Sequence, residues 1–321
     1  MRTAHVLAGL AMVLAAATLM AASAGQPVTP KPAPTKEIPQ PSVEFLDDAF
    51  KEVAAPGAEV KAIGQDFQFT EGPTWMPEGF LVFSDIPADT LYRWDEKGGL
   101  AEFRKPSRNA NGNTVDPEGR LVTAEHGSRS VTRTGKDGKV ETLAATHQGK
   151  RLNSPNDVVV KRDGSVWFTD PPYGIKPDQV EQPGNYVYRL SPGAKEPVPV
   201  IKDLTRPNGL AFSPDEKYLY VAISDGKAPE IRRYPVQADN TLGPPTVAAT
   251  IKPGAPDGIR VDKAGRIFSS AGDGVQVFSP EGKLLGKFRT PQGATNCCLG
   301  GPDGKTLFIT ARPGVYTVRL K

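Results

Sequence analysis

Six oxygen-bearing side chains recur along this sequence, each at the start of a short, mostly apolar run. They follow one another at intervals of 40, 45, 52, 49 and 39 residues and are Glu71, Asn111, Asn156, Asn208, Asp257 and Asn296. Carboxylate and amide oxygens are the ligands that a hard cation prefers, and Ca²⁺ accepts about six to eight of them in irregular geometry. If the fold brings these positions together, the chain could hold a divalent ion and use it in catalysis.

Each of these residues opens the same local pattern. A short apolar segment follows it, then a turn and a second β run, as in EGPTWMPEGFLVFSD from Glu71 and NGLAFSPDEKYLYVA from Asn208. A third β run follows in each unit and a weaker fourth run in most. The ninth position of the pattern is a turn glycine, which adopts positive φ at low cost, in five copies: Gly79, Gly119, Gly164, Gly265 and Gly304.

Four short strands every 40 to 50 residues is the period of a β-propeller blade. The sequence therefore predicts an all-β fold, a six-bladed β-propeller with four-stranded blades. The sixth copy reaches the end of the chain after its third strand, and we expect EVKAIGQ (59–65) to supply its outer strand and close the ring. Because the innermost strand of each blade lines the central channel, the six repeated residues should form a ring around it.

The N-terminal region has a different composition. Residues 1–24 combine Arg2, an apolar run from Val6 to Met20 and the small residues Ala22-Ser23-Ala24, which are the parts of a cleavable signal peptide. We therefore expect a periplasmic or secreted protein with no membrane span in the mature chain. Residues 25–42 are rich in proline and predict an extended tether, which leaves 43–321 for the propeller.

Charge and cysteine content exclude several classes of function. The formal net charge is only +3 and no basic run stands out, so nothing points to nucleic acid. Cys297 and Cys298 are adjacent, which predicts buried, small hydrophobic side chains, with a vicinal disulfide as the alternative. Two motif-based functions are also excluded. The Asp-rich turns are too short to be EF-hand loops. The sequence contains no G-x-S-x-G motif, which a serine hydrolase of the α/β type would require.

Several longer segments resemble one family of six-bladed propellers, the gluconolactonase, senescence-marker-protein (regucalcin) and luciferin-regenerating family. The resemblance covers residues 60–320, and AEHGSRSVTR (124–133) is similar to its bacterial gluconolactonase branch. The other segments that carry it are FTEGPTW (69–75), RLNSPNDVVV (151–160), FTDPPYG (168–174), RPNGLAFSPDEKYLY (206–220), PDGIRVD (256–262) and TNCCLGGPDGKTLFITA (295–311).

The resemblance implies a metal-dependent lactonase that hydrolyses a small sugar lactone to its aldonic acid. It selects four residues of the predicted ring as metal ligands, namely Glu71, Asn156, Asn208 and Asp257. The implied metal is Ca²⁺, with Mg²⁺, Mn²⁺ or Zn²⁺ as alternatives, although only His126 and His147 lie outside the signal peptide and no Cys/His spacing indicates a zinc site.

The resemblance also assigns the general base to Asp257, and Asp157 is a second candidate for this role. Regucalcin-like members have an arginine where this chain has Ser154, so Arg151 or Asn153 could take over its contacts with substrate. The expected substrate-binding residues are Asn111, Asn113, His126, Arg151, Asn153 and Tyr173.

Two other functions fit the same residues. In the first, the propeller is a non-catalytic periplasmic binding or scaffold module, and Ca²⁺ only holds the channel together. In the second, the chain is a lactonase or phosphotriesterase with a different class of substrate. The sequence leaves both open.

Overall fold

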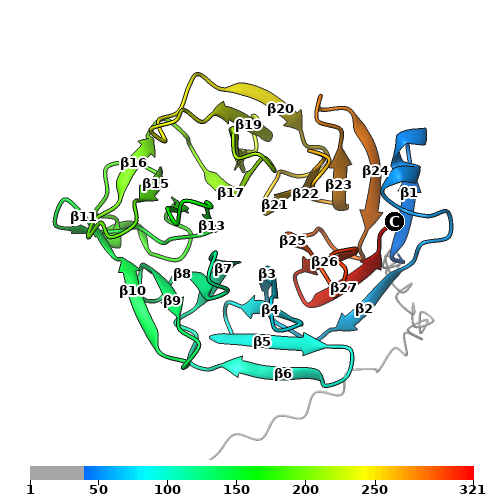
Figure 1. Cartoon of the computed structure of the whole chain (residues 1–321), viewed down its shortest axis with the longest axis horizontal. Coiled ribbons are helices and arrows are strands. Elements are labelled where there is room, and N and C mark those ends of the chain that lie inside the picture. Colours follow the sequence, from blue (N-terminus) through cyan, green and yellow to red (C-terminus); the bar gives the residue numbers. More distant parts are fainter. Residues whose placement is uncertain (1–39) are drawn as a thin grey trace, which may run out of the picture. The chain divides into compact units, whose positions relative to one another are not determined.

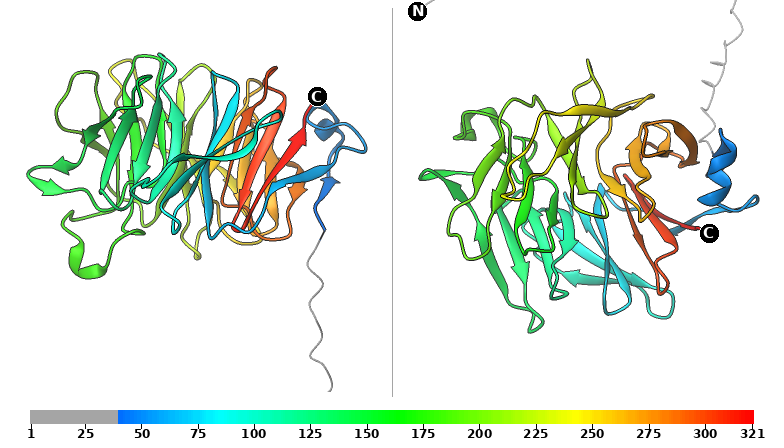
Figure 2. Two further views of the ribbon diagram at one scale, coloured as in Figure 1. Left: turned by 90° about the horizontal axis from the view of Figure 1, so that it is seen from below. Right: turned by 45° about the horizontal axis from the view of Figure 1, so that its top comes forward.

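The computed structural model describes residues 40–321, which form a ring of six antiparallel sheets around a central channel (Figure 1). The strands run across the thickness of the ring from one face to the other (Figure 2). This confirms the predicted all-β, six-bladed propeller. The predicted signal peptide (1–24) and residues 25–39 of the predicted tether lie outside the described residues.

The first three blades each contain four consecutive strands. Blade 1 comprises β3 (Thr70–Met76), β4 (Phe80–Asp85), β5 (Thr90–Asp95) and β6 (Gly99–Arg104). Blade 2 comprises β7 (Ala110–Val115), β8 (Leu121–Glu125), β9 (Ser130–Thr134) and β10 (Val140–Ala144). Blade 3 comprises β13 (Val158–Val160), β14 (Val166–Asp170), β15 (Tyr186–Leu190) and β16 (Val198–Ile201).

Two of the last three blades, blades 5 and 6, include a strand from the segment that precedes the first repeat. Blade 4 comprises β17 (Pro207–Phe212), β18 (Tyr218–Ile223), β19 (Glu230–Pro235) and β20 (Thr246–Thr250). Blade 5 comprises β21 (Ile259–Val261), β22 (Ile267–Ala271), β23 (Gly274–Phe278), β24 (Leu284–Arg289) and β1 (Ser42–Phe45). Blade 6 comprises β25 (Asn296–Gly300), β26 (Thr306–Ala311), β27 (Gly314–Arg319) and β2 (Val60–Gly64).

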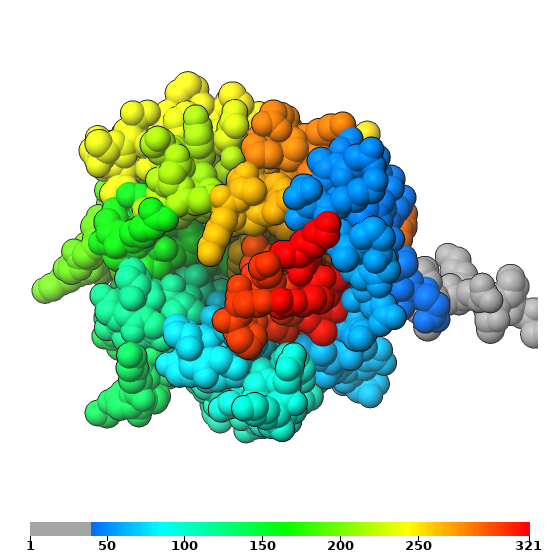
Figure 3. Space-filling view, turned by 45° about the vertical axis from the view of Figure 1, so that its right-hand side comes forward, coloured from blue at the N-terminus to red at the C-terminus, as the bar shows by residue number. Residues whose placement is uncertain are grey.

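The segment that leads into the first repeat packs beside the end of the chain. β2 pairs antiparallel with β27 as the outer strand of blade 6. β1 pairs with β24, so blade 5 has five strands rather than the predicted four, and Ser42 belongs to this strand rather than to the tether. Figure 3 shows this N-terminal segment in blue against the C-terminal strands in red and orange. Both strands thus protect edges that would otherwise be open to pairing.

The remaining elements lie outside the blades. They are two 3-10 helices, η1 (Asp48–Glu52) and η2 (Pro177–Gln179), and a short hairpin formed by β11 (Thr146–His147) and β12 (Lys150–Arg151). Within residues 40–321 no helix is both long and apolar enough to span a membrane.

The core lies between neighbouring blades rather than at the centre of the ring. Alternate side chains of the two innermost strands of a blade face the two adjacent blades. Leu81 and Phe83 of blade 1 pack against Cys298 and Phe308 of blade 6, and equivalent apolar clusters join the other pairs of neighbours. Cys298 and its neighbour Cys297 are buried free thiols, as predicted for small hydrophobic residues. This packing leaves the polar ends of the inner strands to line the channel.

Candidate metal-binding and catalytic site

A cavity of about 590 Å³ opens at one end of the channel. It is lined by residues where the inner strands begin and where the second strands of the blades end. Five of the six predicted ring residues are in this lining: Glu71, Asn111, Asn156, Asn208 and Asp257. The sixth, Asn296, contacts the ring through its side chain, because its Nδ2 donates to Glu71 Oε2 at 3.0 Å. The repeated positions therefore converge as the sequence predicts.

The glycines that follow four of the ring residues let neighbouring blades approach closely. A Cβ on Gly209 would lie 2.3 Å from Asp257 O, and a Cβ on Gly258 would lie 1.9 Å from Asn296 Cγ. Gly209 N also donates to Asp257 O at 3.0 Å. Asn111-Gly112 and Asn208-Gly209 lie within strands β7 and β17 rather than in turns. The four glycines thus allow their blades to place a polar residue directly against the next blade.

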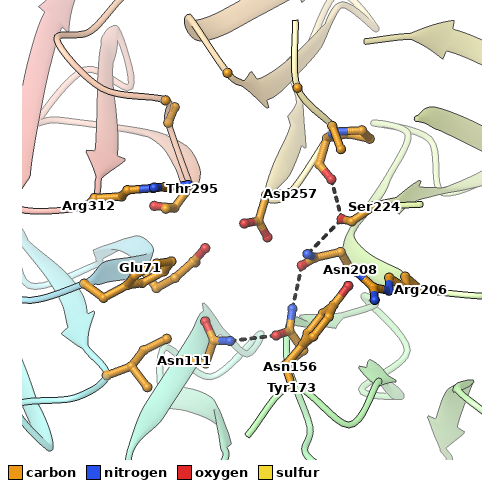
Figure 4. Close-up of a pocket in the computed structure, with 18 of the residues that line it drawn as sticks. Glu71, Asn111, Asn156, Tyr173, Arg206, Asn208, Ser224, Asp257, Thr295 and Arg312 are labelled. Atoms are coloured by element: carbon orange, nitrogen blue, oxygen red, sulfur yellow. Dashed lines mark hydrogen bonds between the residues drawn. The ribbon is translucent and has the colours of Figure 1, made fainter. Parts of the chain in front are cut away.

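The amides form a directed hydrogen-bond chain around one side of the cavity (Figure 4). Asn111 Nδ2 donates to Asn156 Oδ1 at 2.7 Å, and Asn156 Nδ2 donates to Asn208 Oδ1 at 2.6 Å. Asn208 Nδ2 continues to Ser224 Oγ at 3.0 Å, which donates to Pro256 O. Asn111 Oδ1, on the first residue of this series of hydrogen bonds, is buried and has no hydrogen-bond partner within residues 40–321. It is therefore free to accept from a ligand.

Two carboxylates face one another across the floor of the cavity. Burial raises the pKa of Asp257 to about 7, and the negative charge of Asp157 contributes to this shift. Burial and the charge of Asp257 raise the pKa of Glu71 well above its usual value. Neither carboxylate forms an ion pair with a cationic side chain in the described part of the chain. Two negatively charged carboxylates in one buried site are unfavourable unless they share a proton or a cation.

These residues fit a hard divalent cation. Among residues 40–321 no three His, Cys, Asp or Glu side chains gather into a metal site. An ion at the channel floor would therefore take the two carboxylates of Glu71 and Asp257 together with the amide oxygens of Asn156 and Asn208. A set made only of oxygens suits Ca²⁺ or Mg²⁺ better than a soft metal.

Asp157, the second candidate base, does not line the cavity. Its Oδ1 accepts from Val158 N at 3.0 Å, while Oδ2 accepts from Leu210 N at 3.3 Å and faces Arg260 Nη1 at 3.5 Å. Burial raises the pKa of Asp157, and the charge of Arg260 opposes that shift. Both oxygens are thus engaged between blades 3, 4 and 5, which favours a structural role.

His126 and Tyr173, two of the expected substrate-binding residues, line the cavity. His126 Nε2 is 3.1 Å from Asn111 Nδ2, which already donates to Asn156. Burial lowers the pKa of His126 to about 4, so the neutral ring can accept this second amide hydrogen. Tyr173 stands at the rim with 41% of its surface exposed. The loop that carries it is held by Ser154, whose Oγ accepts from Gly174 N at 2.9 Å.

Three other predicted substrate-binding residues do not line the cavity. Asn113 is buried between blades 1 and 2, where its Nδ2 donates to Gly72 O at 2.9 Å. Asn153 is buried and donates to Asp170 O at 3.1 Å. Arg151 is exposed on the β11–β12 hairpin. These three side chains donate hydrogen bonds to backbone carbonyl oxygens and do not face a ligand in the cavity.

Several lining residues escaped the sequence analysis. Pro256 and Thr295 directly precede the ring residues Asp257 and Asn296, whereas Arg206, Ser224 and Arg312 lie in the connections between strands. The one signal that could have identified three of them is position, because Arg206 lies two residues before Asn208, and Pro256 and Thr295 lie one residue before Asp257 and Asn296.

Comparisons with known proteins agree with this architecture. The family model described as SMP-30/Gluconolactonase/LRE-like region matches residues 69–312. A gluconolactonase of Zymomonas mobilis is 36% identical over 85% of this chain and 84% of its own length. A pentonolactonase of Haloferax volcanii is 27% identical over 76% of this chain and 81% of its own length.

Solved structures give the same result. A structure of a gluconolactonase from Xanthomonas campestris is 37% identical to this chain, covers 88% of it and 97% of its own length, and superposes with a TM-score of 0.82. A regucalcin of Agrobacterium tumefaciens, described as a calcium-binding protein, is 19% identical with a TM-score of 0.69 and supports the fold alone. Because the family model matches residues 69–312, this chain belongs to the SMP-30/gluconolactonase/LRE-like family.

Proposed function

We propose that this protein hydrolyses a sugar lactone to the corresponding aldonic acid with the help of one divalent cation, Ca²⁺. The observation that carries the proposal is the convergence of two buried carboxylates and a chain of amides on the floor of one cavity. The names of the relatives, gluconolactonase and pentonolactonase, support a sugar lactone as substrate. The proposed ligands are Glu71, Asn156, Asn208 and Asp257.

A bound divalent cation would supply Lewis-acid polarisation of the lactone carbonyl. Asp257 lines the cavity, and in this proposal its carboxylate accepts a proton from the attacking water. The water oxygen bonds to the carbonyl carbon, the ring C–O bond breaks, and the proton passes to the departing ring oxygen. Asn111 Oδ1, which has no hydrogen-bond partner within residues 40–321, and the rim residue Tyr173 would bind and orient the hydroxyl groups of the sugar.

Acid release from D-glucono-1,5-lactone in a pH-stat tests this function. We expect turnover above the spontaneous rate, its loss on chelation and its return when Ca²⁺ is restored. Asp257→Ala should lose turnover and keep the circular dichroism spectrum of the fold. The exposed Asp178→Ala removes a carboxylate outside the cavity and is the matched control.

The same experiment distinguishes the rival functions. Full activity in Asp257→Ala would refute its proposed role. Calcium binding without turnover of any sugar lactone would favour a scaffold. Turnover of only homoserine lactones or phosphotriesters would move the protein to another substrate class.

We also propose that the protein acts outside the cytoplasm, because the composition of residues 1–24 is that of a secretory signal peptide. N-terminal sequencing of the protein recovered from a periplasmic or culture fraction should give a chain that starts at Gly25. Recovery of the uncleaved chain in the cytoplasm would contradict this.

A further inference from the structure

Two arginines line the cavity without a partner of their own. Arg206 lies just before β17 in blade 4, and Arg312 lies in the turn between β26 and β27 in blade 6. Both are exposed, and within residues 40–321 neither side chain forms a hydrogen bond or an ion pair. They stand on opposite sides of Asp257 (Figure 4). Many other arginines of the ring are paired, among them Arg104 with Glu125 and Arg266 with Asp262.

The charge of the cavity changes sign from floor to rim. The floor carries Glu71 and Asp257, whose negative charges a divalent cation would neutralise. The two guanidinium groups would then leave the loaded cavity with a net positive charge. A neutral sugar lactone does not require this field. A positively charged cleft with low-dielectric walls concentrates anions and raises their rate of association.

The type of cation also matters. A guanidinium group presents a planar fork of donors that matches a carboxylate, phosphate or sulfonate, and it binds these groups through paired hydrogen bonds. Arg206 lies next to the rim aromatic Tyr173 (Figure 4). Burial raises the pKa of Tyr173 to about 12, and the charge of Arg206 opposes this shift. An aromatic ring beside a guanidinium is a suitable surface for a sugar ring that ends in an anionic group.

We infer that the substrates are sugar lactones with an anionic group at the end remote from the lactone carbonyl. Arg206, beside Tyr173, receives this group at the rim, and Arg312, on the other side of Asp257, adds to the positive charge that attracts it, while the carbonyl faces the carboxylates at the floor. The inference rests on the proposed lactonase function and narrows its substrate class. The shared chemistry is a carboxylate, a phosphate or a sulfonate on the terminal carbon of the sugar.

The test compares kcat/KM for D-glucono-1,5-lactone with that for analogues whose terminal carbon carries a phosphate, a sulfonate or a carboxylate, at one fixed concentration of free Ca²⁺. We expect at least one analogue to be preferred about tenfold or more, which corresponds to about 1.4 kcal/mol. The preferred analogue identifies the anion. Its advantage should shrink as the ionic strength rises, because salt screens exposed charges.

The double variant Arg206→Gln/Arg312→Gln should bring the ratio of anionic to neutral kcat/KM close to one. The matched control is Arg162→Gln, an exposed arginine in the β13–β14 turn that lines no part of the cavity, and it should keep the wild-type ratio. Equal kcat/KM for neutral and anionic lactones, or a preference that survives the double variant, would overturn the inference.

Calorimetry separates failure of the inference from failure of the proposed function. Gluconate and the aldonic acids that carry a phosphate, a sulfonate or a carboxylate on the terminal carbon, at the same free Ca²⁺, report binding without turnover. If no lactone is hydrolysed, the lactonase function fails, but tighter binding of one of the three charged acids that is lost in the double variant still supports an anion-binding rim. Equal binding of gluconate and all three charged acids contradicts that rim whatever the activity.

Discussion

Asn296 Nδ2 donates to Glu71 Oε2 at 3.0 Å, although the two residues are 225 positions apart in the sequence. The bond joins the inner strand of the last blade to that of the first. Gly72 N donates to the same oxygen at 2.6 Å, so two donors fix the carboxylate at the channel floor. Asn296 thus positions a proposed metal ligand without lining the cavity itself.

Asn296→Ala should weaken the site. It removes one of the two donors to Glu71, which costs about 1–2 kcal/mol for a buried carboxylate. We expect kcat/KM to fall about tenfold and the Kd for Ca²⁺ to rise by a similar factor. Asn296→Asp should be worse, because it adds a like charge beside Glu71. Gln237→Ala, which removes an exposed amide, is the control. Unchanged Ca²⁺ affinity in Asn296→Ala would show that Glu71 does not depend on this bond.

Gly258→Ala should disturb the same interface by steric overlap. Its Cβ would lie 1.9 Å from Asn296 Cγ, so either the side chain of Asn296 or the backbone of blade 5 must shift. Overpacking of this kind costs about 1–3 kcal/mol, and we expect a lower Tm together with reduced activity. Gly226→Ala is the matched control, because a Cβ there meets nothing within 4 Å. If the two variants melt at the same temperature, the close approach of the blades is not required for stability.

Tyr173→Ala should raise KM about tenfold with a smaller effect on kcat, because the ring stands at the rim rather than beside the reacting carbonyl. Tyr173→Phe should retain most of the affinity if the aromatic face makes the contact. Tyr218 is a comparably exposed tyrosine, on β18 and outside the cavity, and Tyr218→Ala serves as the control. A fall in kcat at constant KM would place Tyr173 in the chemical step instead.

Asp170 should make the stability of the protein depend on pH. Burial raises its pKa to about 7 from an ordinary value of 3.8, and hydrogen bonds from Asn153 N and Ser154 N offset only part of this shift. The folded protein therefore keeps a proton that the unfolded chain releases as pH rises above about 4. The free energy of unfolding should fall between about pH 4 and pH 7 and change little from this source at higher pH.

Urea unfolding at pH 4.5 and pH 7.5 checks this linkage. The difference in free energy of unfolding between the two pH values should shrink in Asp170→Asn, which cannot ionise, and persist in the exposed control Asp178→Asn. Equal pH dependence in wild type and Asp170→Asn would mean that Asp170 is ionised in the folded protein throughout this range.

The repeat in the sequence was sufficient to predict the ring and the residues that converge in it. Each polar strand start occupies one position of a fixed pattern, and the symmetry of a propeller converts that position into a place on the channel. The loops have no such symmetry. Arg206 and Arg312 lie in segments of different length and conformation, so no register relates them to one another.

Local backbone geometry explains two further differences from expectation. Asn113 lies two residues after Asn111, but the pairing of β7 with β8 shifts between Ala110 and Asn113, and the Asn113 side chain points between blades. β1 has only four residues, SVEF, and adjoins a proline-rich segment, which leaves too short an alternation to predict a strand. Its pairing with β24 depends on a tertiary contact with a sequence about 240 residues away.

Titration of Ca²⁺ into the metal-free protein, followed by calorimetry, tests most directly whether the polar ring is a cation site. The account predicts one ion per chain for the wild type and for the control Asp178→Asn, and a loss of at least tenfold in affinity for Glu71→Gln and for Asp257→Asn. Identical Ca²⁺ binding in wild type and both ring variants would contradict it, as would a wild-type protein that binds no divalent ion.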